Sequence, residues 1–414
     1  MKLLIVANNL MPKTNANTNI VYRLADMLQQ QYGDEILFLG TQTAAKELSA
    51  EQHYSSWQIP TVYQYQQKIP ETLSKKEKVI RLLLNPALWE YKLRSVTDRY
   101  PLQRQYRKYL RQILRAEKSI DCVLCVSCPH DTLYAASRVV KKVPLASYQL
   151  DPWSTNSCYH GNPQVAREEK SALSRCAVAF VTREMDRERR EGIFAPPLDR
   201  VIPLEFPNLI QPPNGKDRFS EFGKEWIHCA YVGQLYPESV RGPRHLFTLF
   251  RELEKYGIML HVIGNSAAQA KQYESSLSKN IILHGRVSPK EAKAYMMSAD
   301  ILVNMGNTIP NMLPSKTIDY ISCGKPILNL CKIPSCPTIP YMEKYGNALT
   351  IMEKDTAKTD VINRIVAFCK EKNGYSMSFA EVKELFFECT PEHVAGVIHK
   401  TLQEVIKDNC IHGE

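Results

Sequence analysis

The fold of this chain is constrained most strongly by a regular alternation of short apolar runs with longer amphipathic segments. Residues 2–8 (KLLIVAN) have the composition of a buried strand, and residues 19–33 have the apolar spacing of a helix that ends at Gly33. Apolar runs at 35–40 and 121–127 continue the pattern. Strands that are apolar on both faces and alternate with helices are typical of a doubly wound parallel sheet, so we predict an α/β fold.

The same alternation starts a second time after a polar stretch rich in proline and glycine. A chain of 414 residues is also too long for one ordinary core. We therefore predict two Rossmann-like doubly wound domains that face a central cleft, where a ligand would bind. The predicted parts are an N-terminal domain (1–210), a linker (211–225), a C-terminal domain (226–385) and a C-terminal helix (386–414) that packs back toward the N-terminal domain.

The start of the chain and its cysteines bear on its compartment. The apolar run after Lys2 is shorter than the ~7–15 residues of a signal-peptide core, and no stretch reaches the ~20 apolar residues of a transmembrane helix. The 12 cysteines, most of them isolated in apolar stretches, are typical of reduced thiols in the cytosol. We therefore expect a cytoplasmic protein.

Most of the net charge of +10 is concentrated between residues 73 and 120. This segment holds 13 Lys and Arg against 4 acidic residues, interleaved with the apolar run VIRLLLNPALWEYKL. A basic, amphipathic segment with aromatic residues is typical of a surface that binds anionic lipid; nucleic acid binding and a plain pair of solvated helices are the alternatives. We predict that segment 73–120 holds the protein at the inner face of the cell membrane and that no nucleic acid binds.

The stretch DCVLCVSCPHD (121–131) places three cysteines three residues apart. A metal cluster would need these thiols on one side, with a fourth cysteine nearby. In a strand, however, Cys122 and Cys128 face one way and Cys125 the other, and the α/β order requires a strand here. We therefore predict no metal site. His130 follows the strand end and is a candidate catalytic residue, with a structural histidine as the alternative.

Residues 307–328 (NTIPNMLPSKTIDYISCGKPIL) carry the most informative local pattern. Ser315 is a candidate helix N-cap, and the free N–H groups of the first turn, together with Lys316, would form an anion site. Asp319 lies one turn further on and suits two adjacent hydroxyls such as a ribose diol, while Gly324 would end the helix. A phosphate-binding site and a diol acceptor one turn apart predict a binding site for a nucleotide diphosphate. An ordinary capped helix is the alternative.

Several well-known signatures are absent from the sequence. It has no G-x-G-x-x-G, no G-x-x-x-x-G-K-[ST], no H-E-x-x-H and no tandem repeat. These absences argue against an NAD enzyme, a P-loop ATPase and a zinc protease of the H-E-x-x-H type.

The sequence resembles a known family over nearly its whole length. PSKTIDYISCGKPIL (314–328) resembles the PSK-x-x-E-Y-x-x-x-G-K-P segment of GT-B glycosyltransferases in the large retaining family 4, in the branch that builds bacterial capsule, O-antigen and exopolysaccharide. AYVGQLYPESVRGPRHLF (230–247) and NIILHGRVSPKEAKAYMMSADI (280–301) resemble two further motifs of the family's second domain. In the first half, PLASYQLDPW (144–153) resembles the family's strand that ends in D-x-W.

The resemblance implies a donor-binding set in the C-terminal domain. Its members are Gly233, Arg241, Arg286, Val287, Asn311, Ser315, Lys316, Thr317 and Asp319. Within this set, Asp319 matches the ribose-binding acid and Arg241 lies near the phosphate-binding lysine of the family. The acceptor loop would include Asn15, Asn17 and Asn19, and the candidate catalytic residues are His130, Asp151 and Lys316. Asp151 would orient the acceptor hydroxyl or, alternatively, cap the next turn.

The chain departs from the family pattern at four places. Asn311 occupies the position of the first of two paired glutamates, Gln234 that of a phosphate-binding arginine, and Ser127 that of a catalytic histidine. TNANTN (14–19) replaces the Gly-Gly of the first loop. Because Ser127 stands where the family has its histidine, His130 is the candidate replacement.

These features together predict a glycosyltransferase that moves a sugar from a nucleotide diphosphate sugar to a glycan or lipid-linked acceptor in cell-surface polysaccharide synthesis. The nucleotide sugar would be a co-substrate, and no cofactor is expected. Lys316, Arg241 and the helix dipole, rather than a metal, would stabilise the departing diphosphate. Retention of the anomeric configuration is implied by the resemblance. The alternatives are a GT-B nucleotide-sugar epimerase and a catalytically silent glycosyltransferase-like partner protein.

Overall fold

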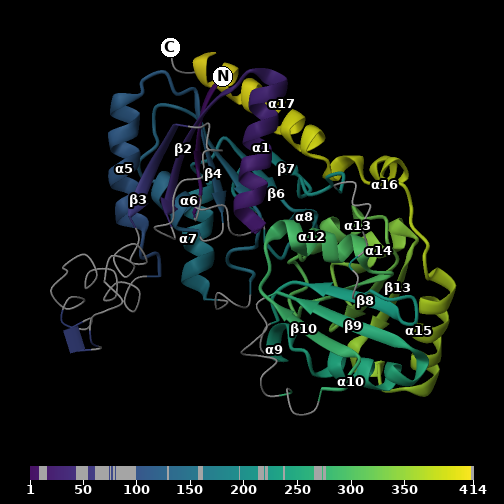
Figure 1. The fold of residues 1–414 in the computed structure, drawn as a ribbon. Helices are drawn as coiled ribbons and strands as arrows, with labels where there is room; N and C mark the ends of the chain where they lie inside the picture. Colours follow the sequence, from purple (N-terminus) through teal and green to yellow (C-terminus); the bar gives the residue numbers. More distant parts are fainter. Residues whose placement is uncertain are drawn as a thin grey trace. The chain divides into compact units, whose positions relative to one another are not determined.

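The structure is a computed structural model of the 414-residue chain. It describes residues 1–8, 16–42, 55–60, 74, 76–77, 80, 99–127, 130–156, 162–194, 196–212, 219, 222–235, 238–264, 273 and 277–411. The chain divides into two compact units (Figure 1): unit 1 comprises Met1–Pro207 and Pro391–Glu414, and unit 2 comprises Asn208–Thr390. The segment 211–225, predicted as a linker, therefore falls in unit 2.

Unit 1 contains a seven-stranded parallel sheet with the strand order β3-β2-β1-β4-β5-β6-β7. The order reverses beside β1, which is the doubly wound arrangement predicted from the sequence. The strands are β1 (Lys2–Val6), β2 (Glu35–Gln42), β3 (Ser55–Pro60), β4 (Cys122–Ser127), β5 (Leu145–Gln149), β6 (Val178–Val181) and β7 (Val201–Pro203). Strands β4, β5 and β6 are buried along their whole length, as their continuous apolar runs predict.

Helices cover both faces of the unit 1 sheet (Figure 1). They are α1 (Ala16–Tyr32), α5 (Gln103–Ala116), α6 (Asp131–Ala136), α7 (Pro163–Leu173), α8 (Arg183–Arg190) and α17 (Pro391–Ile411). Helices α5, α6 and α7 bury their apolar side chains in one cluster with Leu4, Val6 and Cys125 of the sheet. On the opposite face, the ring of Tyr22 in α1 packs edge-on against Phe38 of β2, with 5.3 Å between the ring centroids.

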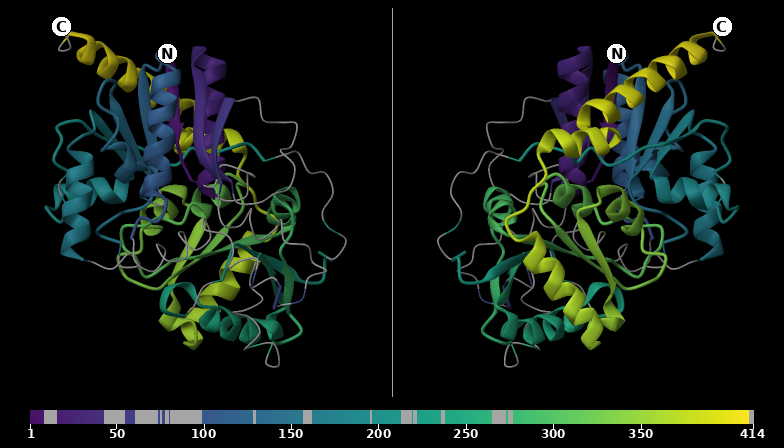
Figure 2. Two further views of the ribbon diagram at one scale, coloured as in Figure 1. Left: turned by 90° about the vertical axis from the view of Figure 1, so that its left-hand side faces the viewer. Right: turned by 90° about the vertical axis from the view of Figure 1, so that its right-hand side faces the viewer.

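The C-terminal helix α17 belongs to unit 1 and lies beside α1 (Figures 1 and 2). Its buried side includes Ile398 and Leu402. His399 Nδ1 lies 2.7 Å from one carboxylate oxygen of Asp34, and the N-terminal amine of Met1 lies 2.9 Å from the other. The first and last parts of the chain are thus joined through one buried carboxylate.

Unit 2 contains a six-stranded parallel sheet with the order β10-β9-β8-β11-β12-β13. Its strands are β8 (Ile227–Val232), β9 (Ile258–Ile263), β10 (Ile281–Gly285), β11 (Ile301–Met305), β12 (Ile327–Cys331) and β13 (Ala348–Met352). The order again reverses beside its first strand, β8, so both sheets have the predicted Rossmann-like topology.

The helices of unit 2 lie on both faces of its sheet (Figure 1). They are α9 (Glu238–Arg241), α10 (Arg244–Leu253), α12 (Pro289–Ser298), α13 (Lys316–Ile321), α14 (Ile339–Tyr345), α15 (Thr359–Lys372) and α16 (Phe379–Leu385), with short 3₁₀ turns η2 (Glu254–Tyr256), η4 (Glu353–Asp355) and η5 (Phe387–Cys389). Helices α10 and α15 share one apolar cluster with the sheet, which includes Phe250, Ile365 and Val262.

A hydrogen-bonded chain of three histidines crosses the other face of this sheet. His228 Nδ1 lies 2.9 Å from His261 Nε2, and His261 Nδ1 lies 2.9 Å from His284 Nε2. One end of the chain is the carbonyl of Gly223, 3.0 Å from His228 Nε2, and the other is the hydroxyl of Tyr295, 3.1 Å from His284 Nδ1. Because a carbonyl can only accept, His228 Nε2 donates to it, and each neutral ring then donates through Nε2 and accepts through Nδ1.

The centre of this histidine chain is buried against an aromatic ring. His261 has no exposed surface, and the ring of Phe222 stacks on it with 4.2 Å between the centroids. Burial, followed by the neighbouring His228 and His284, lowers the pKa of His261 from its ordinary value of 6.5 to about 3. The ring is therefore neutral at physiological pH.

The structure corrects the placement of Asn17 and Asn19 in a loop, while their contact with an acceptor stays a prediction. Helix α1 begins at Ala16, so Asn17 and Asn19 lie on its first turn rather than in a loop, and Asn15 lies outside the described residues. The helix starts early because Thr18 is fully buried and shares a face with the apolar residues three and four positions later. Among the described residues, no helix is long and apolar enough to cross a bilayer.

Candidate functional site

Four neighbouring strands of unit 2 each end in, or are directly followed by, a glycine at the carboxyl edge of the sheet. Gly285 is the last residue of β10, while Gly264, Gly233 and Gly306 directly follow β9, β8 and β11. Glycine in such positions lets a ligand approach the main chain closely. Ligands of doubly wound sheets bind at the carboxyl ends of the strands where the strand order reverses, which here is between β8 and β11. We call this row of four glycines the glycine edge.

The main chains of the glycine edge are packed more closely than side chains would allow. A Cβ atom on Gly264 would lie 2.1 Å from the carbonyl oxygen of Gly233, and Gly264 has φ +139°. The N–H of Gly264 donates to the carbonyl of Gly285 at 2.8 Å. Only glycine therefore fits at position 264.

Helix α13 is fixed to this edge by Tyr320. Its buried hydroxyl donates to the carbonyl of Val232 at 2.9 Å and lies 2.8 Å from the N–H of the same residue. Because Val232 is the last residue of β8, Tyr320 ties α13 to the carboxyl end of the central strand. The sequence pattern alone does not indicate this role, although Tyr320 stands within the motif that carries the resemblance.

The residues predicted to bind phosphate and ribose lie on α13. Lys316 Nζ and Asp319 Oδ2 are 3.2 Å apart, and their side chains are 42% and 19% exposed. Ser315 stands at the N-cap position, but it is helical (φ −56°, ψ −25°) and its hydroxyl makes no capping bond to the first turn, so the predicted cap is wrong. Thr317 is buried, and its hydroxyl has no hydrogen-bond partner among the described residues. Gly324 ends the helical turn with φ +69°, as predicted.

The other predicted donor residues lie around the glycine edge. Arg241 is the half-buried last residue of α9, and Asn311 is buried in the loop before α13. Arg286 is exposed and Val287 half-buried, directly after β10. Their binding roles stay predictions.

Asn307 shapes the loop between β11 and α13. It is fully buried, its Nδ2 donates to the carbonyl of Met312 at 3.0 Å, and its Oδ1 accepts from the N–H of Ile309 at 2.8 Å. Sequence reasoning missed this residue. The available signal was its position directly after the glycine that follows β11.

The candidate catalytic residues of unit 1 follow the carboxyl ends of β4 and β5. His130 is buried, and its ring lies parallel to that of Trp153, with 4.6 Å between the centroids. Burial lowers the pKa of His130 to about 3, so the ring is neutral at pH 7. Asp151 is half-buried two residues after β5, and Ser127 is the buried last residue of β4. The catalytic roles of His130 and Asp151 stay predictions.

The strand predicted for the cysteine-rich stretch is confirmed as β4. Cys122 and Cys125 are fully buried in it, while Cys128 lies outside the described residues. Burial raises the pKa of Cys122 to about 12, which is the behaviour of a structural thiol. Within the described part of the chain, no group of three or more histidine, cysteine or acidic side chains could hold a metal ion.

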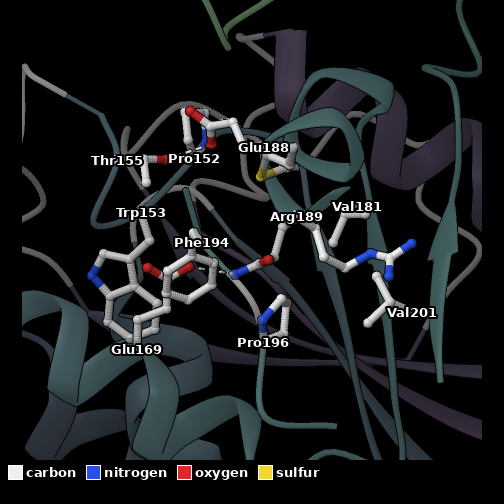
Figure 3. A pocket seen from close by; sticks show the side chains of 12 residues that line it. Pro152, Trp153, Thr155, Glu169, Val181, Glu188, Arg189, Phe194, Pro196 and Val201 are labelled. Atoms are coloured by element: carbon white, nitrogen blue, oxygen red, sulfur yellow. Dashed lines mark hydrogen bonds between the residues drawn. The ribbon is translucent and has the colours of Figure 1, made fainter. Parts of the chain in front are cut away.

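A small pocket of unit 1 lies beside the carboxyl end of β5 (Figure 3). Its apolar walls include Trp153 and Phe194, and it contains the buried carboxylates of Glu169 and Glu188. Glu169 accepts a hydrogen bond from the side chain of Gln149 at 3.3 Å. Burial raises the pKa of Glu169. Sequence reasoning missed these two carboxylates, because helix acids are usually exposed.

Several solved structures share this architecture. No family model and no curated protein matches the sequence. Among solved structures, sucrose-phosphate synthase from Thermosynechococcus elongatus matches with a TM-score of 0.68 and 12% identity over 98% of this chain and 99% of that chain. UDP-GlcNAc 2-epimerase from Methanocaldococcus jannaschii matches with a TM-score of 0.57 and 12% identity over 98% and 100%. The lipopolysaccharide outer core galactosyltransferase WaaB matches with a TM-score of 0.52 and 13% identity over the whole of both chains.

The chain has the GT-B fold. Its two Rossmann-like sheets confirm the predicted fold class. Unit 2 is the C-terminal Rossmann-like part of this GT-B chain and carries the glycine edge, while unit 1 is the N-terminal part and carries His130 and Asp151.

Proposed function

We propose that this GT-B protein is a glycosyltransferase that moves a sugar from a nucleotide diphosphate sugar to a glycan or lipid-linked acceptor in cell-surface polysaccharide synthesis. The observation that carries the proposal is the glycine edge of unit 2 together with Lys316 and Asp319 of α13, which Tyr320 ties to the same edge. The nucleotide sugar is a co-substrate, and no further cofactor is required.

The groups of the site suit the parts of such a donor. The diphosphate would lie along the glycine edge, where Lys316 would add a positive charge. Asp319 would accept hydrogen bonds from the ribose hydroxyls. Because Lys316 and Asp319 pair with each other at 3.2 Å, binding would exchange this ion pair for one bond to phosphate and one to ribose.

Catalysis would consist mainly of stabilising the departing diphosphate. The positive charges of Lys316 and Arg241 would oppose the negative charge that develops on the leaving oxygen, without a metal. Helix α13 has only six residues, so its dipole adds less than the two side chains. The acceptor would bind unit 1, where Asp151 would orient the attacking hydroxyl and the sugar would be transferred with retention.

The donor site is tested by calorimetric titration of the full-length protein with UDP-, GDP- and ADP-sugars. We expect binding of at least one of them, weakened about tenfold or more by Asp319→Asn, since the amide cannot accept two hydroxyl bonds in the same way. Asp355→Asn is the matched control, because Asp355 pairs with Lys358 at the same spacing, at 2.8 Å, elsewhere in unit 2. Binding of none of the nucleotide sugars, or equal loss in both variants, would contradict the proposal.

The structural match to UDP-GlcNAc 2-epimerase makes an epimerase the second candidate. Incubation with UDP-GlcNAc in the absence of an acceptor distinguishes the two. An NMR spectrum that shows a new C2 epimer would favour the epimerase and contradict the transferase, whereas an unchanged nucleotide sugar is expected of a transferase that lacks its acceptor.

We further propose that the basic segment 73–120 holds the protein at an anionic membrane surface. Its best described part is α5, which buries Tyr106, Leu110 and Ile113. The opposite side of the helix exposes basic residues at intervals of three or four, namely Arg104, Lys108, Arg111 and Arg115. The helix contains no acidic residue. A continuous basic stripe of this kind is attracted to anionic lipid.

Vesicle co-sedimentation tests the membrane proposal. We expect binding to vesicles that contain phosphatidylglycerol, weakening with salt, and loss of most of this binding when the four exposed basic residues of α5 are changed to Gln. A control variant changes four other exposed basic residues of unit 1, namely Lys141, Lys142, Arg167 and Arg175. Equal loss in both variants would show a general charge effect and contradict a specific role for α5.

A further inference from the structure

Two cysteines of unit 2, Cys331 and Cys336, lie together beside the glycine edge. Cys331 is the last residue of β12, and Cys336 lies in the loop between β12 and α14. Both are free thiols, with exposed fractions of 0% and 2%. The hydroxyl of Thr338 lies 3.7 Å from the sulfur of Cys331 and 3.1 Å from that of Cys336. One hydroxyl thus contacts both sulfur atoms.

Gly306 borders the same space from the neighbouring strand. A Cβ atom at Gly306 would lie 2.7 Å from Cys336 Sγ and 3.5 Å from Cys331 Cα. The missing side chain therefore makes room for the sulfur of Cys336 next to the backbone of Cys331. The two cysteines are separated by only four residues and meet at one point of the unit, which suits an intramolecular disulfide.

The surroundings shift the pKa values of the two thiols in opposite directions. The thiol of Cys331, then the hydroxyl and N–H of Thr338 and the charge of Arg241, lower the pKa of Cys336 in spite of its burial. The contact with Cys336, followed by burial, raises the pKa of Cys331, whose sulfur also accepts from Asn329 Nδ2 at 3.3 Å. Cys336 is therefore the more acidic of the two thiols, which suits an attacking cysteine with Cys331 as the resolving one.

A second cysteine pair in unit 2 lacks these features. Cys229 and Cys369 are both fully buried and contact each other. Burial, followed by the contact with Cys369, raises the pKa of Cys229. Cys229 and Cys369 are therefore a second close thiol pair in the same unit and form an internal control.

We propose that Cys331 and Cys336 form a redox-responsive dithiol that a hydroperoxide converts to an intramolecular disulfide. The thiolate of Cys336 attacks the terminal oxygen of the hydroperoxide and breaks the O–O bond. The other oxygen takes a proton and leaves as alcohol or water, and Cys336 becomes a sulfenic acid. The sulfur of Cys331 then attacks this sulfur, and its proton leaves with the hydroxyl group as water. Two electrons pass from the two cysteines to the peroxide.

Disulfide mapping on the full-length protein tests the proposal. The protein is treated with hydrogen peroxide, denatured in the presence of N-ethylmaleimide so that buried thiols are also blocked, and digested with trypsin without reduction. Trypsin cuts after Lys332, between the two cysteines, so the disulfide would join peptide 317–332 to peptide 333–344. We expect this linked pair to form through Cys331 and Cys336, and Cys229 and Cys369 to stay blocked by the maleimide. In Cys331→Ser, dimedone should trap a sulfenic acid on Cys336.

The alkylation rate gives a second measurement that needs no variant. We expect the rate constant of Cys336 with iodoacetamide to level off at a lower pH than that of a free thiol, because the pKa of Cys336 is lowered. Peroxide treatment that oxidises Cys410 without linking Cys331 to Cys336 would overturn the proposal. Equal oxidation of Cys229 with Cys369, or the pH dependence of a free thiol at Cys336, would also overturn it.

Discussion

The buried histidine chain of unit 2 makes this unit sensitive to acid, and His261 allows the effect to be isolated. The pKa of His261 is about 3 in the folded chain, against 6.5 for an ordinary histidine. Between these values the unfolded chain binds more protons than the folded chain. The stability that the neutral ring contributes is therefore fully present above about pH 6.5 and is lost as the pH falls toward about 3.

The size of this loss follows from the two pKa values. Linkage gives a decrease of about 2 kcal/mol in the free energy of unfolding of unit 2 between about pH 7.5 and about pH 5, from His261 alone. The variant His261→Gln keeps a side-chain donor and acceptor but does not titrate. We expect it to lose about 2 kcal/mol less than the wild type over the same pH interval.

Urea unfolding followed by pulse proteolysis measures this difference, with the protected fragments assigned by mass spectrometry so that unit 2 is followed separately. Any constant effect of the Gln side chain on packing cancels, because each protein is compared with itself at two pH values. His245→Gln is the control, because it changes a half-buried histidine of unit 2 that does not belong to the three-histidine chain. An equal acid-induced loss in wild type and His261→Gln would refute the assignment of the acid sensitivity to the buried ring.

Three further predictions concern the packing of the two units. Gly264→Ala should destabilise unit 2 by roughly 2–5 kcal/mol in urea unfolding, because its Cβ would meet the carbonyl oxygen of Gly233. Gly285→Ala is the control and should cost only about 1 kcal/mol, because the space around that position is open. Equal costs would contradict the close packing at Gly264. Tyr320→Phe removes both hydrogen bonds to Val232 at the end of β8 and should destabilise unit 2 by roughly 1–3 kcal/mol per lost bond. We also expect weaker nucleotide-sugar binding in the calorimetric titration. Unchanged stability would count against the anchoring role of Tyr320. Asp34→Ala should destabilise unit 1 by roughly 3–5 kcal/mol, because Met1 and His399 lose their buried partner. Hydrogen exchange in α17 should become faster. Exchange as slow as in the wild type would refute the coupling of α17 to Asp34.

Most of the fold could be predicted because its strands are buried on both faces and read as continuous apolar runs. Strand β3 (SSWQIP) and strand β13, at the sheet edges, lack such a signal. In β13 (ALTIM) the apolar run is interrupted by Thr350, and four of its five residues are only partly buried. Helix ends at Gly33 and Gly324 were predictable because a left-handed glycine conformation is a local property.

The candidate site could be predicted only where its parts are close in the sequence. Lys316 and Asp319 are three residues apart on one helix, so their pairing follows from helix geometry. Tyr320 and its partner Val232 are 88 residues apart, and no local pattern joins them. The same holds for His130 and Trp153, which stand in two separately recognised motifs and meet only in the folded unit.

The place of α17 has a consequence for the order in which the chain can fold during synthesis. Unit 2 is contained in one continuous segment and can complete its core once residue 390 has left the ribosome. Unit 1 cannot, because the helix that covers α1 is made after all the other described elements of the unit, and its contact with Asp34 spans 365 residues. Until then the side of α1 that α17 covers stays open to chaperones, and a chain that stops short of α17 would carry a finished second unit and an unfinished first one.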